Sequence, residues 1–240
     1  MITTKLPDGS SRAERRALRL RDLRSPRYRH LLLLLFWPAE LLLFELTERL
    51  PLDYRPVSCA LDLQIPFCEC FVVPYLLWFL TWTGMLLFLL LRDVPVFRRT
   101  MWYFIISISL AFCVFLLWPN YCPLRPDPLP DRGLCAWLVR LVYAVDRPTD
   151  ACPSLHVVVA LGVCFSAWHA RGISRPVALV LTLHCLLICA SVTFIKQHSL
   201  VDVAVAVPFA ALGYLLCFVP ARCPLWARQP EPDDAGSRSA

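Results

Sequence analysis

Residues 71–91 read FVVPYLLWFLTWTGMLLFLLL, a run without a single charged side chain. A helix that crosses the hydrocarbon core of a bilayer needs roughly 20 mainly apolar residues. A short apolar stretch could belong to a buried core helix, but a run of this length without charges is typical of a membrane span. The stretch therefore predicts a membrane protein.

Five further segments qualify or nearly qualify as spans, at 30–50, 101–118, 154–170, 175–195 and 199–219. The whole chain is 58% hydrophobic, whereas a soluble domain is usually about 45–50% apolar. The sequence thus predicts an all-α fold, a polytopic membrane helix bundle with about six transmembrane helices. Glu40 and Glu45 make the first segment atypical. We expect their faces to point into the protein, or this helix to be tilted or partly interfacial.

Charge divides the chain into three regions: a basic segment at 1–29, a transmembrane domain at 30–219 and a tail at 220–240 with a disordered composition. With six spans, the side that holds both termini carries 17 Lys and Arg residues, against seven on the other side. The positive-inside rule then predicts cytoplasmic termini, and we expect the plasma membrane. The basic segment lacks interleaved aromatic residues, which favours contact with anionic lipid over nucleic-acid binding.

The longest links, at 51–70 and 119–153, lie on the outer side of this topology. The second is rich in proline and contains Leu134–Val145, whose pattern predicts an amphipathic helix on the membrane surface. Proline removes backbone donors, so this segment needs water or a cavity rather than lipid around it. The outer mouth of the bundle is therefore where we expect chemistry.

Three clusters of polar residues fall on that outer side. They are Asn120–Pro126 (NYCPLRP), Cys152–His156 (CPSLH) and Lys196–Asp202 (KQHSLVD). Alone, each has an ordinary structural interpretation as a surface loop, a helix start or a local hydrogen bond. The charge argument did not use them, so their gathering on one side indicates a common site.

The cationic and hydroxyl groups of these clusters suit a phosphate. Arg125 offers a planar fork for two oxygens, and Lys196 offers a point charge. Pro153 is compatible with the first turn of a helix. Ser154 and the N–H groups that follow would then face an anion at the positive end of the helix dipole.

The histidines supply the reactive groups. His198 and Asp202 are four residues apart, so they share one helix face, and the carboxylate can hold one imidazole nitrogen while the other stays free as a nucleophile. His156 lies in the first turn after Ser154 and can reach a bound group. The sequence implies no metal or other cofactor: Cys68–Glu69–Cys70 lacks the second ligand pair that a zinc site would need. Cysteines on the outer side could form disulfides in an oxidising compartment.

This set of motifs resembles the type 2 phosphatidic acid phosphatase superfamily, which also includes the vanadium haloperoxidases. The family pattern is Lys-x6-Arg-Pro, then Pro-Ser-Gly-His, then Ser-Arg-x5-His-x3-Asp. This chain keeps Arg125–Pro126, Pro153–Ser154, His156, Ser191, His198 and Asp202 at the family spacing. It departs from the pattern at Trp118 and Val192, which replace the family's Lys and Arg, and at Leu155, which replaces Gly. The resemblance covers about residues 70–219.

The Lys-Gln-His form of the third motif is similar to a branch related to inositol phosphorylceramide synthases. If the fifth span continues to Lys196, that side chain lies on the same face as Val192 and could refill the vacated cation site.

The resemblance implies a lipid phosphate or diphosphate phosphatase of phospholipid metabolism, an enzyme acting at the outer membrane face. His198 would form a phosphohistidine, Asp202 would orient it, and His156 would act as acid and then base. Arg125, Ser154 and Lys196 would hold the phosphate oxygens. Two alternatives stay open: a lipid phosphotransferase, and a non-enzymatic membrane protein that retains the fold. The expected partners are a membrane lipid phosphate and the bilayer; the sequence indicates neither the lipid nor the oligomeric state.

Overall fold

The computed structural model describes residue 25 and residues 28–129 and 133–219. The basic N-terminal segment and the C-terminal tail expected from the sequence lie almost entirely outside the described residues.

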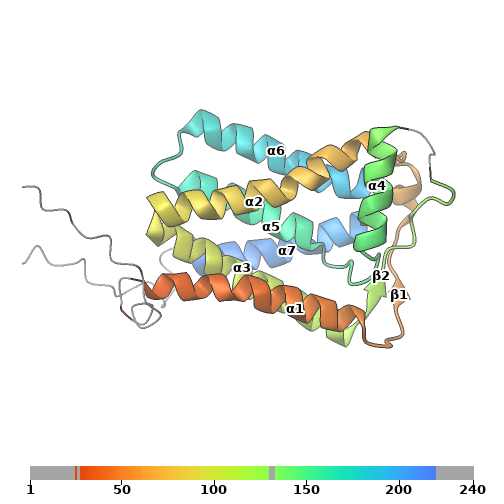
Figure 1. Ribbon diagram of the computed structural model, residues 1–240, viewed down its shortest axis with the longest axis horizontal. Coiled ribbons are helices and arrows are strands. Elements are labelled where there is room, and N and C mark those ends of the chain that lie inside the picture. Colours follow the sequence, from red (N-terminus) through yellow and green to blue (C-terminus); the bar gives the residue numbers. More distant parts are fainter. Residues whose placement is uncertain (1–24, 26–27, 130–132, 220–240) are drawn as a thin grey trace, which may run out of the picture.

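The described chain forms a bundle of long helices (Figure 1). In chain order these are η2 (Arg29–Leu35, a 3₁₀ helix) running into α1 (Phe36–Glu48), then α2 (Val72–Arg92), α3 (Val94–Leu117), α5 (Leu155–His169), α6 (Arg175–Phe194) and α7 (Leu200–Cys217). The remaining elements are short: β1 (Arg55–Pro56), η3 (Ala60–Leu63), η4 (Glu69–Phe71), β2 (Asn120–Tyr121) and α4 (Leu134–Val145). The predicted all-α membrane bundle is confirmed.

Five helical runs of the described residues are long and apolar enough to cross a membrane: Arg29–Thr47, Glu69–Arg92, Val94–Leu117, Arg175–Phe194 and Leu200–Cys217. The one remaining predicted span, at 154–170, corresponds to α5, which has 15 residues. At the helical rise it is about 22 Å long, short of a hydrocarbon core of about 30 Å. It is instead enclosed by protein, because α2, α3, α6 and α7 all pack against it.

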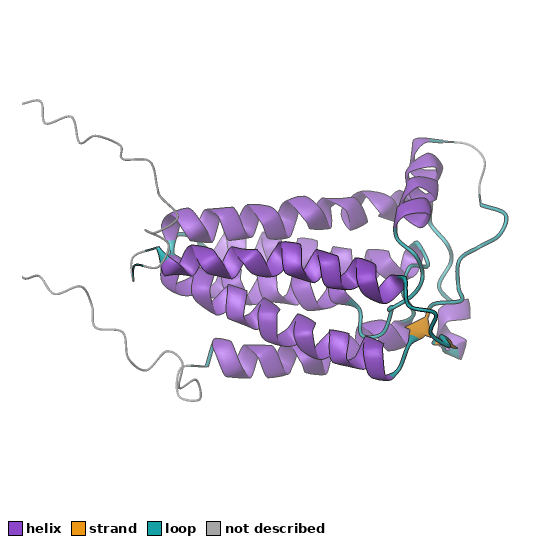
Figure 2. Cartoon of the chain, turned by 60° about the horizontal axis from the view of Figure 1, so that its bottom comes forward, coloured by secondary structure: helices purple, strands orange, loops and turns teal. Residues whose placement is uncertain are grey.

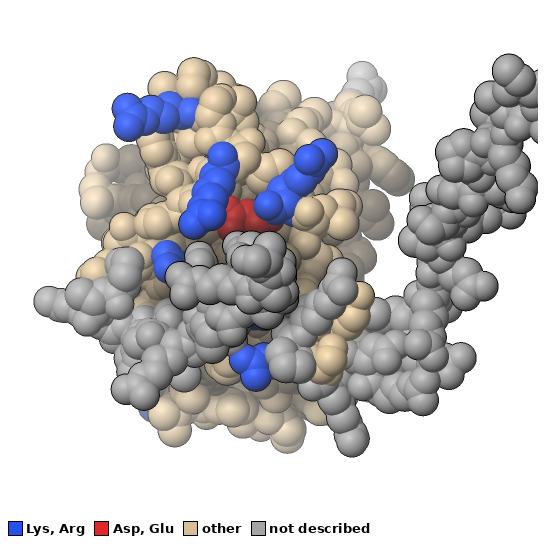
Figure 3. Space-filling model, turned by 90° about the vertical axis from the view of Figure 1, so that its left-hand side faces the viewer, with Lys and Arg blue, Asp and Glu red and all other residues tan. Residues whose placement is uncertain are grey.

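The two ends of the bundle differ in chemistry. α1 begins and α7 ends at the same end (Figure 1), where Lys and Arg side chains gather around a small acidic patch (Figure 3). Asp93 organises this basic end: its carboxylate accepts a hydrogen bond from Val96 N–H at 3.2 Å and caps α3, and it accepts a second from Arg171 N–H at 2.9 Å. One buried side chain thereby joins the α2–α3 turn to the α5–α6 turn.

The middle of the bundle is held by close helix approaches. Tyr103 on α3 is fully buried and donates its hydroxyl proton to the Val158 carbonyl at 2.7 Å. Gly162 and Gly213 face α3 from α5 and α7. A Cβ atom would lie 2.3 Å from Tyr103 at the first position and 2.2 Å from Ser107 Oγ at the second. The bundle therefore depends on small residues where backbones pack against bulky side chains.

Loops and short elements gather at the opposite end, which we call the α4 end (Figure 2). α4 has the bounds predicted from its pattern, Leu134–Val145, and lies across the bundle axis. β1 and β2 pair in parallel, with Arg55 opposite Asn120. All the described cysteines are free thiols, so the disulfides considered from the sequence are not formed among them.

Candidate active site

The three sequence clusters meet at the α4 end, and Asn120 joins two of them. Its side-chain NH₂ donates to the carbonyls of Trp118 at 3.0 Å and Cys152 at 2.9 Å, and its Oδ1 accepts from Cys152 N–H at 2.7 Å. Its backbone carbonyl also accepts from Asp150 N–H at 2.8 Å. This bracing fixes the segment that leads into Ser154 and α5.

His198 is held by its Nδ1, while its Nε2 faces the ring of His156. Its Nδ1 lies 3.0 Å from the Ala151 carbonyl oxygen and 3.4 Å from Asp202 Oδ2. A carbonyl oxygen can only accept a hydrogen bond, so Nδ1 carries the proton in the neutral ring. The lone pair of Nε2 is therefore available, which is the tautomer that a histidine nucleophile needs.

Asp202 supports this arrangement from beneath. It is fully buried in the first turn of α7, and its Oδ2 also accepts from Ser199 N–H at 2.8 Å. Ser199 Oγ in turn accepts from the N–H groups of Val201 and Asp202, which completes a capping box. The cap fixes the start of α7 and hence the carboxylate beside His198.

His156 faces His198 across a short gap. Its Nδ1 lies 3.4 Å from His198 Nε2, and its ring packs between Tyr75 and Trp78, with both centroid separations 4.5 Å. Its Nε2 is buried without a hydrogen-bond partner among the described residues. The structure thus brings the three residues proposed from the sequence as catalytic into one cluster.

Arg125 lies behind this cluster instead of beside the histidines. Its guanidinium donates to the carbonyls of Tyr143 and Asp146 and to the Gln197 side-chain oxygen. Burial lowers the pKa of the guanidinium, and the Asp146 carboxylate opposes that shift. Gln197 also donates to Asp146 Oδ2 at 2.9 Å. Gln197 therefore connects Arg125 to the turn that carries His198.

Lys196 differs most from its expected position. α6 ends at Phe194, and Lys196 adopts a left-handed backbone with φ of 57°. Its ammonium donates to the carbonyls of Asp62 at 2.8 Å and Ile65 at 2.6 Å. The helix continuation that would have aligned it with Val192 is absent, because the chain turns back so that the Gln197 and His198 N–H groups both bond to the Val192 carbonyl.

Ser154 is the N-cap of α5 and is fully buried. Its hydroxyl has no hydrogen-bond partner among the described residues, and its N–H donates to the Asp202 carbonyl at 3.2 Å. The residue therefore lies in the cluster, with its own N–H bound to α7; the expectation for an anion concerned its side chain and the N–H groups that follow it.

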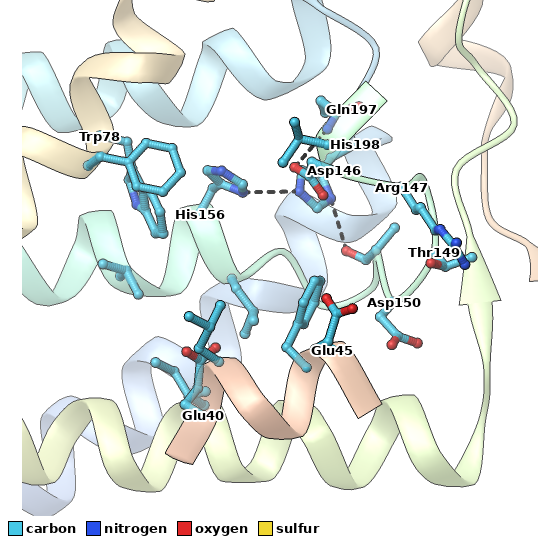
Figure 4. Close-up of a pocket in the computed structure, with 18 of the residues that line it drawn as sticks. Glu40, Glu45, Trp78, Asp146, Arg147, Thr149, Asp150, His156, Gln197 and His198 are labelled. Carbon is cyan, nitrogen blue, oxygen red and sulfur yellow. Dashed lines mark hydrogen bonds between the residues drawn. The ribbon is translucent and has the colours of Figure 1, made fainter. Parts of the chain in front are cut away.

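A cavity of about 560 Å³ opens onto the two histidines (Figure 4). Its polar part is lined by Asp146, Arg147, Thr149, Asp150, His156, Gln197 and His198. Arg147 is the only Lys or Arg in the described lining; Arg125, Ser154 and Lys196 do not reach it.

Sequence reasoning missed Asp146, Arg147 and Asp150. Their position immediately before the second motif was the available signal. Burial raises the pKa of Asp150, and a contact with Thr47 offsets this in part. No group of three or more His, Cys, Asp or Glu side chains among the described residues could hold a metal ion.

The sequence-family model for the PAP2 superfamily matches residues 42–216. These residues contain α2 to α6, all but the last residue of α7, and all three clusters. No curated protein matches the chain. No solved structure matches it either. With the match covering well over half of the sequence and five apolar helices among the described residues long enough to span, this integral membrane protein belongs to the PAP2 superfamily, whose members include phosphatases and phosphotransferases.

Proposed function

We propose that this protein is a lipid phosphate or diphosphate phosphatase that works through a phosphohistidine on His198 Nε2. The observation that carries the proposal is the orientation of that ring. The Ala151 carbonyl and Asp202 hold Nδ1, and Nε2 faces His156 Nδ1 at the cavity that both histidines line and that reaches into the apolar bundle. A lipid can place its phosphate at Nε2 while its chains stay in apolar surroundings.

In the first step the Nε2 lone pair attacks phosphorus and the bond from phosphorus to the lipid oxygen breaks. His156 donates a proton to the leaving oxygen, and Asp202 stabilises the positive charge that develops on the His198 ring. In the second step His156 takes a proton from water as the water oxygen attacks phosphorus, the P–N bond breaks, and inorganic phosphate leaves. His156 Nδ1 lies 3.4 Å from His198 Nε2, so its ring has to move aside to admit phosphorus.

The phosphate oxygens need positive charge and hydrogen-bond donors. Arg147 and Gln197 line the cavity beside the histidines. Arg125 acts on the same place through Gln197, because its guanidinium donates to the Gln197 side-chain oxygen. Ser154, which does not reach the cavity, has a positioning role at the start of α5 in this proposal. For Lys196 we now propose a positioning role, since its ammonium is bound to two carbonyls.

The test is phosphate release from a panel of lipid phosphates by protein purified in detergent. We expect His198→Ala to abolish turnover, and a substrate with labelled phosphorus to leave an acid-labile label on the wild type but not on this variant. Turnover by His198→Ala at the wild-type rate would exclude the mechanism. If wild type releases no phosphate from any lipid while binding it, the non-enzymatic alternative stands.

Transfer to an alcohol is a second candidate, and Asp146 favours it. This carboxylate lines the cavity and accepts from the Tyr75 hydroxyl at 2.6 Å and from Gln197 at 2.9 Å. A carboxylate beside a phosphohistidine repels a phosphate dianion but can accept a proton from an incoming hydroxyl. Adding polyol or lipid alcohols to the same assay distinguishes the two: a phosphorylated alcohol formed in place of free phosphate indicates a transferase.

The proposed orientation puts both termini in the cytoplasm and the α4 end outside. It rests on the sequence excess of 17 cations over seven on the side of the termini. A green fluorescent protein fused to the C-terminus should fluoresce in intact bacteria, because it folds in the cytoplasm. A dark fusion, together with activity of a secreted reporter at the same position, would reverse the orientation.

A further inference from the structure

The cavity has a second part, deeper in the bundle than the histidines. It is lined by aromatic residues of two helices: Trp37 and Phe44 from α1, and Trp78, Phe79 and Trp82 from α2. Trp78 contacts the His156 ring, Trp82 lies one turn further along α2, and Trp37 stacks on Trp82 with a centroid separation of 4.1 Å. One turn is about 5 Å along a helix, so this part begins just below the site of chemistry.

These tryptophans carry polar groups that nothing described satisfies. The indole N–H groups of Trp37, Trp78 and Trp82 are all buried without a hydrogen-bond partner among the described residues. Buried indole N–H groups usually find an acceptor, and at membrane depth water is not there to supply one. The rings of Trp37 and Trp82 are stacked at 21°, so each N–H, which lies in its ring plane, does not point at the face of the other ring.

Glu40 adds a carboxyl group to the same wall. It lies one turn from Trp37 on α1, lines the cavity and points into it (Figure 4). No hydrogen bond or ion pair joins it to a described residue, whereas Glu45, nearer the α4 end, pairs with Arg49. An ionisable side chain inside a span marks a functional site by default. A carboxyl group can donate to a carbonyl oxygen or accept from a hydroxyl.

α1 belongs to the least enclosed part of the wall. Only 6% of the most apolar stretch of Arg29–Thr47, which contains most of α1, is buried inside the protein, against 28–50% for the other four long apolar helices. An outward shift of α1 would uncover the buried N–H groups of Trp37 and Trp82, and among the described residues it would break few helix–helix contacts.

We propose that Glu40, Trp37, Trp78 and Trp82 form a subsite that binds the carbonyl groups of an acylated lipid, a turn below the phosphate. The three indole groups are donors only, so the matching ligand presents acceptors. In an acyl lipid phosphate the carbonyl oxygens lie a few bonds from phosphorus, at this depth. A polyprenyl chain presents none. The inference rests on the proposed function and narrows its substrate to lipids with ester or amide carbonyls.

The test compares lipids that differ only in the carbonyl. Binding of diacyl phosphatidate and of its dialkyl ether analogue, with equal chain lengths, is measured on His198→Ala protein in nanodiscs, so that no turnover is needed. Polyprenyl phosphate and ceramide phosphate extend the series. We expect the diacyl lipid to bind about tenfold or more tightly than the diether, the scale of leaving buried polar groups unpaired. If ceramide phosphate binds more tightly than the diacyl lipid, the preferred ligands are lipids with an amide carbonyl.

Two variants locate the effect. Trp82→Phe keeps a ring for stacking and removes the N–H, and Glu40→Leu removes the carboxyl; each should lower the diacyl-to-diether ratio severalfold. Trp168→Phe is the matched control, because Trp168 is exposed and donates to Thr182 Oγ1 away from the cavity. Equal binding of the two lipids by the His198→Ala protein, or a ratio unchanged in both cavity variants, overturns the subsite. If the wild-type protein turns over no lipid but the diacyl-to-diether binding ratio is as expected, only the proposed phosphatase activity is overturned.

Discussion

Replacing Lys196 by methionine distinguishes the structural role of this residue from the phosphate-binding role that its sequence position suggested. Lys196 is only 8% exposed, and its ammonium donates hydrogen bonds to two backbone carbonyls of the 62–65 segment. The Asp62 carboxylate in turn accepts from Cys59 N–H and from Leu200 N–H, both at 2.7 Å. Lys196 therefore joins the turn that carries His198 to the segment that helps cap α7.

The magnitude follows from the two lost hydrogen bonds. A hydrogen bond from a charged donor contributes about 1.5–3 kcal/mol, and two carbonyls would each lose one, so we expect a loss of about 3–6 kcal/mol. For a chain of this size each kcal/mol lowers Tm by roughly 2–4 °C, which gives a drop of the order of 10 °C. The measurement is thermal unfolding of purified protein in detergent, followed by size-exclusion chromatography after heating.

The activity of the same variant supplies the contrast. Well below its Tm, Lys196→Met should retain phosphate release within about tenfold of wild type, because His198 keeps its contacts with Ala151 and Asp202. If Lys196 instead bound the phosphate, its replacement would lower the rate by about a hundredfold or more and leave Tm unchanged. That second outcome would refute the positioning role. Arg55→Met is the control for removal of a cation, since Arg55 is exposed on β1.

Three further changes test the packing and the site. Gly213→Ala should lower stability by about 1–3 kcal/mol, because its Cβ would lie 2.2 Å from Ser107 Oγ, whereas Gly84→Ala has open space and should be neutral or stabilising in the same thermal assay. Asp202→Asn should leave Tm within a few degrees but cut kcat by about a hundredfold or more, and an unchanged kcat would argue against its role. Burial raises the pKa of the Asp150 carboxyl in the folded state above its unfolded value of 3.8, so the folded state loses stability as pH rises above 3.8 and through the raised folded-state pKa. Asp150→Asn should therefore raise Tm at about pH 7 and give no gain below about pH 4; an equal gain at both pH values would show that the charge is not the cause.

Local pattern was sufficient for the helices and for the reactive pair. Uninterrupted apolar runs can only be long helices in a bilayer, and the helical spacing of apolar residues in Leu134–Val145 predicted a short helix with the observed bounds. His198 and Asp202 do not share a helix face as predicted, because α7 begins at Leu200 with Ser199 as its N-cap, but their separation of four residues across the start of α7 still brings them close. Their contact needed no knowledge of the rest of the fold.

Tertiary contacts decided what the sequence could not. Helical spacing placed Lys196 on the face of Val192, but the Asp62 and Ile65 carbonyls hold its side chain and the backbone leaves the helix two residues earlier. The cavity wall was hidden for a similar reason, because no local pattern tells which helix lies beside α1. The charges of Glu40 and Glu45 were a valid signal that their face of α1 is not wholly lipid-facing, because both line the cavity, although Glu45 is exposed and also pairs with Arg49.

The brace made by Asn120 has a consequence for how this family member could change over evolution. Because one amide ties the carbonyl of Trp118 to both backbone groups of Cys152, the chain leaves the bundle and returns to it at nearly the same point. The excursion between them, with α4 at its far end, resembles an insertion whose two ends are stapled together. Its two ends carry Arg125 and the cavity residues Asp146 to Asp150, so its length can change only between them while α3 and α5 keep their spacing.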